Sequence, residues 1–392
     1  MTAAGRMALS CDDLGPFFDA PHRALGERLR HSDVETLRGD HDGARVARRL
    51  GELGLYRYLV PEALGGAAVG QPANATYVDI RSLVLIREAL GQVSPMADAI
   101  FAVQGLGTYP VVLAGSDEQR ARVLPAALRG DLVAAFALTE PEAGSDAASL
   151  QTTARRDGDG WVLDGEKILI SNVPIAGSHV VFANADPAAG KKGLAAFLVE
   201  AGVRGFDATP MPMSVPHPIG RLVLRGCRVG ATGLLGEVGR GLRLALETLD
   251  TFRISVGAAA VGMARRALDK ALAHVTTRRQ FGAPLAEQQL VRGYLADMAT
   301  ELDAARLLVA RAAHRRDTTG QRVTREAAMA KLFATEAAQR IVDKAVQLHG
   351  GMGVVAGSEV EALYREIRPL RIYEGTTEIQ KLVIARSLLE PT

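Results

Sequence analysis

One acidic residue stands where a turn would present it to a ligand. Glu374 lies in the string Arg371–Gln380, directly before Gly375, and this spacing predicts a sharp turn into a final helix. Thr377 and Gln380 have the Thr-x-x-Gln spacing of a capping box, which predicts that the helix starts at Thr377. The free N–H groups of a helix start favour an anionic ligand. Taken alone, Glu374 is better explained as an exposed loop acid.

Three further strings combine hydroxyls, arginines and glycines as ligand contacts often do. In Phe136–Asp146, the hydroxyls of Thr139 and Ser145 suit a polar ring edge or a phosphate oxygen. Thr277–Pro284 ends one predicted helix with arginines, and Gln347–Gly353 ends another with glycines. Taken singly, the first string is explained by arginines that complement the dipole of the helix end, and the second by glycines that form a helix C-cap. The 2 cysteines and 8 histidines show no metal-ligand spacing, so no metal site is predicted.

The segments around these strings change character twice along the chain. Residues 1–130 show helical spacing of apolar residues, residues 131–237 show short β-rich runs, and residues 238–392 return to long helical patterns. We therefore expect an α+β protein with an N-terminal all-α domain, a middle β domain and a C-terminal helical bundle domain within these limits.

Two local patterns make sharper predictions. Asp164 and Gly165 stand between two β-rich runs, which predicts a hairpin turn at this pair. Leu290, Tyr294, Met298 and Leu302 repeat every four residues, which predicts an apolar stripe buried in the core of a helical bundle.

Composition excludes several classes of protein. The 392 residues carry 46 basic and 44 acidic side chains, and this balance argues against a dedicated nucleic-acid binder. The apolar runs noted in the sequence are too short for an integral membrane protein. The N-terminus lacks the pattern of a signal peptide, and 2 cysteines make no disulfide framework. A cytoplasmic location is the resulting expectation.

The four strings, in this order and at these distances, resemble the acyl-CoA dehydrogenase family. The resemblance is strongest from about residue 131 to residue 389. That family has an N-terminal helical domain, a middle β-barrel or sandwich domain and a C-terminal four-helix bundle, in agreement with the order read from the residues. The resemblance implies non-covalent FAD, a thioester substrate and Glu374 as the catalytic base. Some members carry the base at the position of Phe252, which cannot take a proton.

The chemistry of the family explains these residue types. The α-proton of a thioester is weakly acidic, so its removal needs a close carboxylate, preferably with a pKa raised by an apolar pocket. The charge that develops on the thioester oxygen needs hydrogen-bond donors, which the family takes from the backbone N–H of the base and a flavin hydroxyl. FAD then accepts the β-hydride.

The resemblance also implies the binding residues. Those that match FAD contacts are Phe136, Leu138, Thr139, Ser145, Leu169, Ser171, Arg278, Phe281, Gln289, Gln347, Gly351, Thr376 and Glu378. Those that match substrate contacts are Ser145, Asp250, Arg253, Arg322 and Tyr373. Family members share FAD across subunits through the group from Arg278 to Gly351, which implies a homotetramer or a homodimer.

The sequence departs from the family pattern at three places. Leu169 stands where a Trp is common, which removes a flat surface beside the flavin. The loop Met213–Gly220 replaces the usual Gly-x-Arg-x-Ser-x-Thr motif, and its His217 is either a substrate contact or, more in line with its loop, a surface residue. Phe136 replaces a Tyr and loses only a hydroxyl.

Several functions are compatible with these residues. The leading hypothesis is FAD-dependent α,β-dehydrogenation of an acyl-CoA, with an electron-transfer flavoprotein as the acceptor. The alternatives on the same scaffold are an acyl-CoA oxidase, a dehydrogenase of acyl groups on a carrier protein, and a non-redox lyase. A catalytically silent subunit is a further alternative, against which Glu374, Arg253 and Arg278 speak.

Overall fold

The computed structural model describes residues 14–67, 69–70 and 77–390. By its internal contacts the chain forms two compact units. The helical unit comprises Met1–Arg38, Asp79–Asp98 and Arg253–Thr392, and the sheet unit comprises Gly39–Val78 and Ala99–Phe252. Each unit is described by itself below.

The elements follow the expected order of helix, strand and helix along the chain. The α-helices are α1 Ala20–His31, α2 Gly43–Glu52, α3 Ile80–Val93, α4 Pro95–Ala114, α5 Asp117–Arg129, α6 Gly241–Thr277, α7 Gln289–Thr319, α8 Thr324–His349, α9 Glu359–Ile367 and α10 Thr377–Leu389. The strands are β1 Ala134–Ala137, β2 Thr153–Asp157, β3 Gly160–Ser171, β4 Ser178–Asn184, β5 Leu194–Glu200, β6 Phe206–Pro210, β7 Ile219–Val229, β8 Leu234–Leu235, β9 Arg279–Gln280 and β10 Ala283–Pro284.

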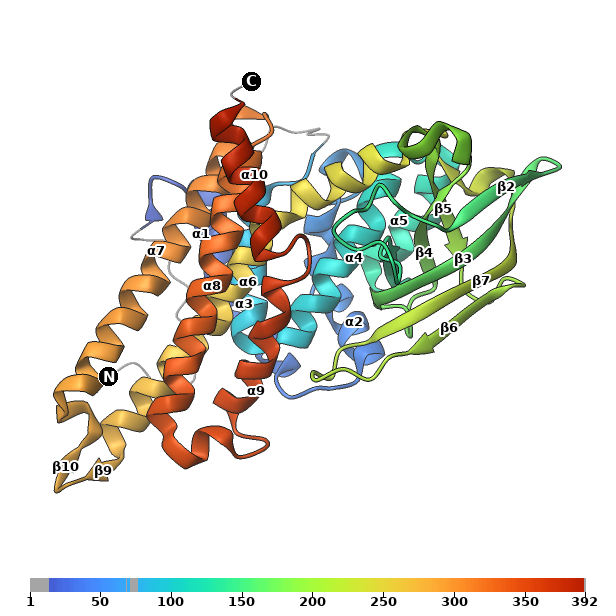
Figure 1. Cartoon of the computed structure of the whole chain (residues 1–392). Helices are drawn as coiled ribbons and strands as arrows, with labels where there is room; N and C mark the ends of the chain where they lie inside the picture. Colours follow the sequence, from blue (N-terminus) through green and yellow to red (C-terminus); the bar gives the residue numbers. More distant parts are fainter. Residues whose placement is uncertain (1–13, 68, 71–76, 391–392) are drawn as a thin grey trace. The chain divides into compact units, whose positions relative to one another are not determined.

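Long helices packed side by side make up the helical unit, where α7 and α8 run along each other (Figure 1). Met298 and Leu302 on α7 are buried, and ion pairs from Arg340 to Glu301 join the outer faces of the two helices. The predicted core stripe is wrong at its first two positions, because the side chains of Leu290 and Tyr294 are 76% and 38% exposed. The first turns of α7 therefore present an apolar face to solvent.

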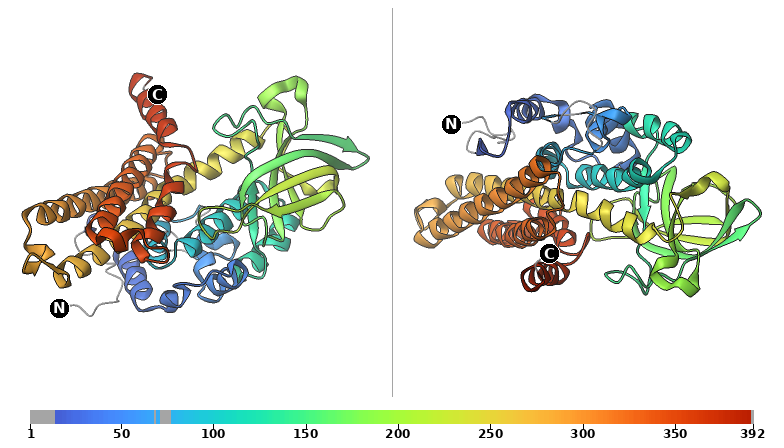
Figure 2. Two further views of the ribbon diagram at one scale, coloured as in Figure 1. Left: turned by 60° about the horizontal axis from the view of Figure 1, so that its bottom comes forward. Right: turned by 90° about the horizontal axis from the view of Figure 1, so that it is seen from above.

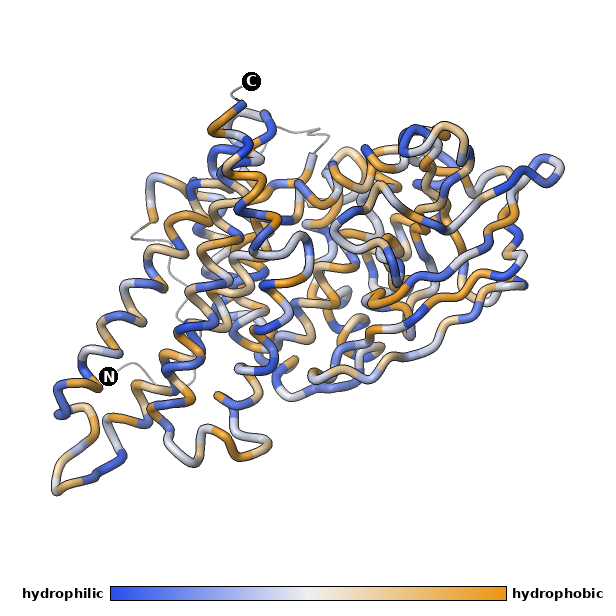
Figure 3. The backbone as a smooth tube through the Cα atoms, in the orientation of Figure 1, coloured by the Kyte–Doolittle hydropathy of each residue, from blue (hydrophilic) through white to orange (hydrophobic). Residues whose placement is uncertain are grey.

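One mixed sheet dominates the sheet unit. Its strand order is β6-β7-β3-β2-β4-β5-β8, with β1 paired in parallel to β4. The strands from β2 to β7 (green) lie together as this sheet (Figure 2). Figure 3 shows apolar and hydrophilic residues mixed along these strands. Strands β4 and β5 are buried along almost their whole length, whereas β2 and β6 are largely exposed or half-buried, so the core lies at β4 and β5.

The predicted hairpin at Asp164 and Gly165 is wrong, because both residues lie inside the continuous strand β3. The turn lies earlier, where Asp157 pairs with Gly160. The register between β3 and β7 shifts from Leu163 to Gly165, so the pair marks a β-bulge. Gly165 has φ +154°, and a Cβ there would lie 2.5 Å from Thr152 Oγ1, so only glycine fits.

Helix α4 is composed largely of apolar residues. Among the described residues, α4 is the one helix that is long and apolar enough to cross a membrane. Its apolar window is 83% buried within the fold, as in a core helix. The limits at residues 130/131 and 237/238 remain predictions, because the contacts divide the chain into two interleaved units instead of three consecutive ones.

Candidate active site

The turn that contains Glu374 is held by three side chains of the helical unit. Glu374 and Gly375 both have left-handed backbones, with φ +52° and +90°. Arg253 Nε on α6 donates to the carbonyl oxygen of Glu374 at 3.3 Å. Gln380 Nε2 on α10 donates to the carbonyl oxygens of Glu374 and Gly375 at 3.3 and 2.9 Å. Lys331 Nζ on α8 donates to the carbonyl oxygen of Gly375 at 2.8 Å.

These contacts explain the glycine and correct the predicted helix cap. A Cβ on Gly375 would lie 2.5 Å from Gln380 Nε2, so a side chain there would displace the amide that fixes the turn. The predicted cap at Thr377 is wrong by one residue, because Thr376 Oγ1 accepts from the N–H of Ile379 at 3.3 Å. The hydroxyl of Thr377 donates instead to Glu336 at 2.6 Å, and Gln380 serves the turn.

The carboxyl group of Glu374 is the chemically available group of the turn. Its Oε2 is buried and has no hydrogen-bond partner among the described residues. Burial raises the pKa of Glu374, whereas the cationic groups of Arg87, Arg253 and Lys331 lower it, and the net direction is upward. A buried, unpartnered carboxylate with a raised pKa is suited to accept a proton from a bound molecule.

A buried ion pair accompanies the turn. Arg87 on α3 is fully buried and donates twice to Asp98 on α4, at 2.8 Å each. It also donates to Ser255 Oγ on α6 at 3.0 Å. Burial raises the pKa of Tyr373 above its usual value, so the phenol stays neutral.

Sequence reasoning missed two of these residues. Arg87 stands in the apolar run Leu83–Leu90, and Lys331 stands in the apolar stripe of α8, yet both are fully buried. A charged residue inside an apolar helical pattern is a usable signal, because such a charge needs a partner in the fold. Burial lowers the pKa of Lys331 to about 8.

The predicted flavin string lies in the sheet unit at the end of β1. Lys167 on β3 is fully buried and pairs with Glu140 Oε1 at 2.7 Å. The same ammonium donates to the carbonyl oxygen of Leu138 at 3.1 Å, and the N–H of Ile168 donates to the carbonyl oxygen of Thr139 at 3.0 Å. The structure thus brings the loop after β1 against the β3 segment that contains Leu169.

The predicted contacts on these two segments offer both hydroxyl and apolar groups. Ser145 is exposed, and Thr139 and Ser171 are half-buried. Leu169 has a left-handed backbone, φ +56°, and its side chain is 48% exposed. The ring of Phe136 packs against Phe182, with centroids 4.9 Å apart. Neutral hydroxyls beside an exposed apolar side chain fit the polar and flat parts of a flavin nucleotide.

The group predicted to reach a neighbouring FAD lies in the helical unit at the ends of helices. The N–H of Arg278 donates to the carbonyl oxygen of His274 at 2.8 Å, and the His274 ring stacks on His349 with centroids 4.4 Å apart. This contact places the ends of α6 and α8 together. The side chain of Phe281, in the β9–β10 turn, is 96% exposed. The other members are also exposed: Gln289, Gln347 and Gly351.

The predicted substrate contacts are distributed over both units. Arg253 is buried beside the Glu374 turn and Tyr373 precedes the base, whereas Arg322 is exposed in the loop between α7 and α8. Asp250 is half-buried on the part of α6 that belongs to the sheet unit. At the alternative base position, Phe252 is buried with its ring edge against Tyr109, 5.5 Å between centroids.

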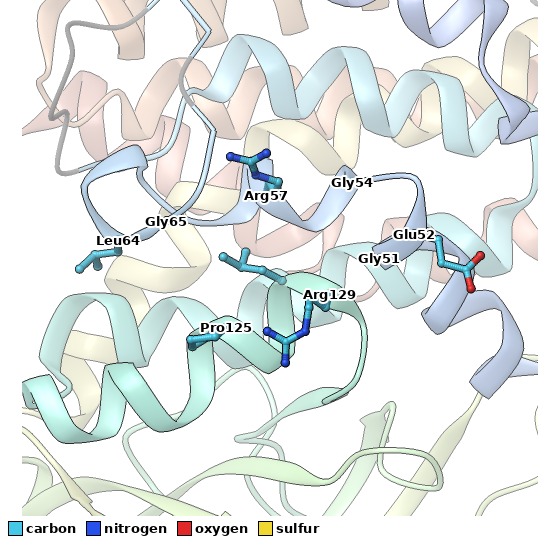
Figure 4. Close-up of a pocket in the computed structure, with 9 residues that line it drawn as sticks. Gly51, Glu52, Gly54, Arg57, Leu64, Gly65, Pro125 and Arg129 are labelled. Carbon is cyan, nitrogen blue, oxygen red and sulfur yellow. The ribbon is translucent and has the colours of Figure 1, made fainter.

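Two further features, the residue His217 and one pocket, are not assigned to the candidate site. His217 is half-buried in the loop before β7, and its role stays open between the two expectations. A pocket of about 500 Å³ in the sheet unit is lined by Gly51, Glu52, Gly54, Arg57, Leu64, Gly65, Pro125, Leu128 and Arg129 (Figure 4). This pocket contains none of the predicted site residues, so it is not the candidate site.

Comparison with known proteins identifies the class to which this fold and site belong. The N-terminal, middle and C-terminal domains of acyl-CoA dehydrogenase match residues 22–131, 135–227 and 239–389. The chain belongs to the acyl-CoA dehydrogenase family. It is therefore an oxidoreductase of the CH–CH group of acyl-CoA, and the cofactor of the family is FAD.

Individual relatives cover almost the whole chain. The chain is 36% identical to 3-(aryl)acrylate reductase of Clostridium sporogenes over 95% of this chain and 100% of that protein. It is 40% identical to the human mitochondrial short-chain specific acyl-CoA dehydrogenase over 88% of this chain and 82% of that protein. A Bacillus anthracis acyl-CoA dehydrogenase complexed with FAD is similar in structure, with TM-score 0.84 and 30% identity over 95% of this chain and 67% of that chain.

Proposed function

We propose that Glu374 is the base that removes the α-proton of an acyl-CoA during its α,β-dehydrogenation. The observation that carries this assignment is the buried Oε2 atom, which has no hydrogen-bond partner among the described residues. Arg253, Lys331 and Gln380 donate to backbone carbonyl oxygens and so hold the turn in place. None of these bonds uses the carboxyl group of Glu374, which stays available to accept a proton. A fixed base near its substrate avoids the entropy cost of orientation.

The residues of this chain would divide the work as follows. Glu374 takes the α-proton at Oε2, and its own backbone N–H is the protein donor we assign to the thioester oxygen. The raised pKa of Glu374 brings its proton affinity closer to that of the weakly acidic α-carbon. Tyr373 and Arg253 border the base, and the loop from Leu138 to Ser145 would hold the flavin. FAD, when bound, supplies the acceptor for the β-hydride.

The test uses the holoenzyme and a panel of straight and branched acyl-CoAs. Under anaerobic conditions, bleaching of the flavin absorbance reports dehydrogenation, and exchange of α-hydrogens in D₂O, followed by mass spectrometry, reports the base alone. Glu374→Gln should lower both rates by about 100- to 10,000-fold while the protein stays yellow. The matched control is Glu361→Gln, a half-buried acid of α9 that pairs with Arg365, and it should behave as wild type. Near-normal exchange in Glu374→Gln would overturn the assignment.

The same panel separates the alternatives. Bleaching only by an acyl group on a carrier protein would replace the acyl-CoA substrate, and fast reoxidation by oxygen would identify an oxidase in place of an electron-transfer flavoprotein partner. A product of unchanged hydrogen content would identify a lyase. Reduction of an α,β-unsaturated thioester by pre-reduced enzyme would favour the reductive direction, which the named activity of the Clostridium sporogenes relative suggests.

We further propose a homotetramer or homodimer in the cytoplasm. The exposed apolar side chains of Phe281, Leu290, Met352 and Val354 support an interface in the helical unit, because large apolar areas left open to solvent often mark an interface with another protein. Arg278 would then reach a neighbour's FAD. Light scattering of wild type and of Phe281→Ser tests this proposal, which predicts that the variant dissociates and loses flavin together. A monomeric, yellow wild type would contradict it.

A further inference from the structure

Glu336 on helix α8 connects the two ends of the loop that carries the base. Its Oε1 atom accepts from Arg371 Nε at 2.8 Å and from the hydroxyl of Thr377 at 2.6 Å. Arg371 is the last residue of a short 3₁₀-helix and Thr377 is the first residue of α10, so residues 372–376 link two helical elements. Glu374 is the central residue of this link, which we call the base loop. One carboxylate of α8 therefore holds both ends of the base loop together.

The same carboxylate anchors the turn of α10 that holds the base directly. Thr377 and Gln380 both lie in the first turn of α10. Gln380 Nε2 donates to the carbonyl oxygens of Glu374 and Gly375 at 3.3 and 2.9 Å. Helix α8 packs against α10, so the anchor is part of a rigid helix pair. Hydrogen bonds thus lead from Glu336 to Thr377, and from the same turn of α10 to the backbone of the base.

The base loop needs this support because its backbone is in a rarely populated conformation. Glu374 has φ +52°, a left-handed conformation that a residue with a side chain keeps only where its surroundings impose it. If the ends of the base loop were free to separate, Glu374 could relax to a commoner conformation, and its carboxyl group would move. A displacement of about 1 Å in a reacting group can lower a rate on the order of 100-fold.

We propose that Glu336 is a positioning residue, which holds the base loop closed at Arg371 and Thr377 so that Glu374 keeps the conformation needed for proton removal. Glu336 acts through the loop and through α10, and it takes no proton from the substrate. The proposal rests on the proposed role of Glu374 as the base.

Variants of Thr377 test one of the two bonds. Thr377→Val removes the hydroxyl and keeps the shape of the side chain, whereas Thr377→Ser keeps the hydroxyl. Thr377→Val should lower the maximal rate of flavin reduction by about 3- to 10-fold, the usual size for one hydrogen bond to a charged group. The acyl-CoA concentration for half-maximal rate should not change, because the ground-state contacts of the substrate remain. Thr377→Ser should restore the wild-type rate.

Variants of Glu336 test both bonds together. Glu336→Leu should lower the maximal rate by about 10- to 100-fold, and Glu336→Gln, whose amide oxygen can accept both bonds, should recover most of it. Glu336→Leu/Thr377→Val should be no slower than Glu336→Leu, because both changes break the same connection. The matched control is Glu361→Leu, which should keep the wild-type rate. Its side chain is 21% exposed against 23% for Glu336, and it also accepts from an arginine, Arg365.

The experiment measures α-hydrogen exchange of an acyl-CoA in D₂O and anaerobic flavin reduction by stopped flow, per bound flavin, for the holoenzyme and each variant. Thermal unfolding of the same samples reports stability. A role in stability alone would lower the unfolding temperature and leave both rates per bound flavin unchanged. If Glu336→Leu does not fold, the Thr377→Val and Thr377→Ser pair decides the question.

The outcomes separate this inference from the proposed function. If Glu374→Gln keeps normal exchange, the base itself is wrong. If Glu374→Gln loses exchange but Glu336→Leu and Thr377→Val keep wild-type rates, the base stands and the positioning role of Glu336 is overturned. Slower exchange and slower reduction in both variants, with recovery in Thr377→Ser and no change in Glu361→Leu, support it.

Discussion

Two buried lysines hold the two functional loops, one in each unit. In the sheet unit, Lys167 donates to the carbonyl oxygen of Leu138 at 3.1 Å, at the start of the flavin string. In the helical unit, Lys331 donates to the carbonyl oxygen of Gly375 at 2.8 Å, in the turn of the base. Burial lowers the pKa of each lysine to about 8.

The lysines differ in the partner of their charge. Lys167 pairs directly with Glu140, whose carboxylate also accepts from the N–H groups of Gln151 and Thr152, so the charge is neutralised on the spot. Lys331 instead donates to the carbonyl oxygen of Gly375 in the turn, and its positive charge acts on the Glu374 carboxyl group. The first lysine therefore serves the stability of a loop, and the second serves the electrostatics of the base.

The largest expected effect is on the stability of the sheet unit. Lys167→Met leaves the buried Glu140 carboxylate without its cation, which should cost about 3–5 kcal/mol of unfolding free energy. Chemical denaturation monitored by circular dichroism measures this loss, with Lys191→Met, an exposed lysine of the same unit, as the control. A loss below about 1 kcal/mol would remove the distinction between the two lysines.

The next effect is kinetic and belongs to the helical unit. Lys331→Met removes a charged donor from the turn, so Glu374 loses both a fixed backbone and a nearby positive charge. Flavin reduction should slow by about 10- to 100-fold, equivalent to about 1–3 kcal/mol. Lys344→Met on the same helix, where Lys344 pairs with Asp297 at 3.0 Å, is the control. Stopped-flow reduction that matches wild type would contradict the assignment.

The two lysines should share one pH signature. Each has a folded-state pKa near 8, below the value of about 10.4 in an unfolded chain, so the unfolded state binds more protons between these values. Stability should therefore rise with pH in this window, by about 1–3 kcal/mol for each lysine. Denaturation at pH 7 and pH 10 measures this rise in the free energy of unfolding. Each Lys→Met variant should lack the part of the rise that its lysine contributes. An equal rise in wild type and in both variants would show that neither lysine is depressed.

The smallest effect concerns Leu169, a left-handed residue of strand β3. Leu169 adopts φ +56° with an exposed side chain, so Leu169→Asn should stabilise the fold by about 0.5–1 kcal/mol, because Asn tolerates this conformation better. Thermal unfolding measures the gain. The exposed control Leu382→Asn lies in helix α10, where it should not stabilise. A loss of stability at Leu169 would mean that its side chain packs in the folded protein.

Local patterns were sufficient for much of the fold. The helical pattern of residues 238–392 predicts helices such as α8, and α10 starts at Thr377 as predicted, although its N-cap is Thr376. The Asp164-Gly165 pair misled because a bulge and a hairpin turn use the same residue types, and only the neighbouring Thr152 distinguishes them. Leu290 and Tyr294 follow core periodicity yet lie exposed, since periodicity marks an apolar face without saying what covers it.

Site residues within a contiguous motif could be predicted from the sequence. Site residues that the fold brings together from distant positions could not. Glu374 is recognised from the residues beside it, and Phe252 is correctly excluded as a proton acceptor from its type alone. Lys331 lies 44 positions before Gly375, the residue whose carbonyl it binds. The residues around Asp98 predict no role for it, because its partner Arg87 is on another helix. Such pairs arise from helix packing, which a single sequence does not state.

The bidentate pair of Arg87 and Asp98 also restricts how this chain can evolve. A change at either position alone leaves an uncompensated charge inside the helical unit, so the first of two substitutions is selected against even where the final pair would be harmless. Positions 87 and 98 should consequently vary together among descendants of this sequence, as charged pairs or as apolar pairs. The pair can thus serve as a lineage marker, which separates chains that share this buried ion pair from chains that merely share the fold.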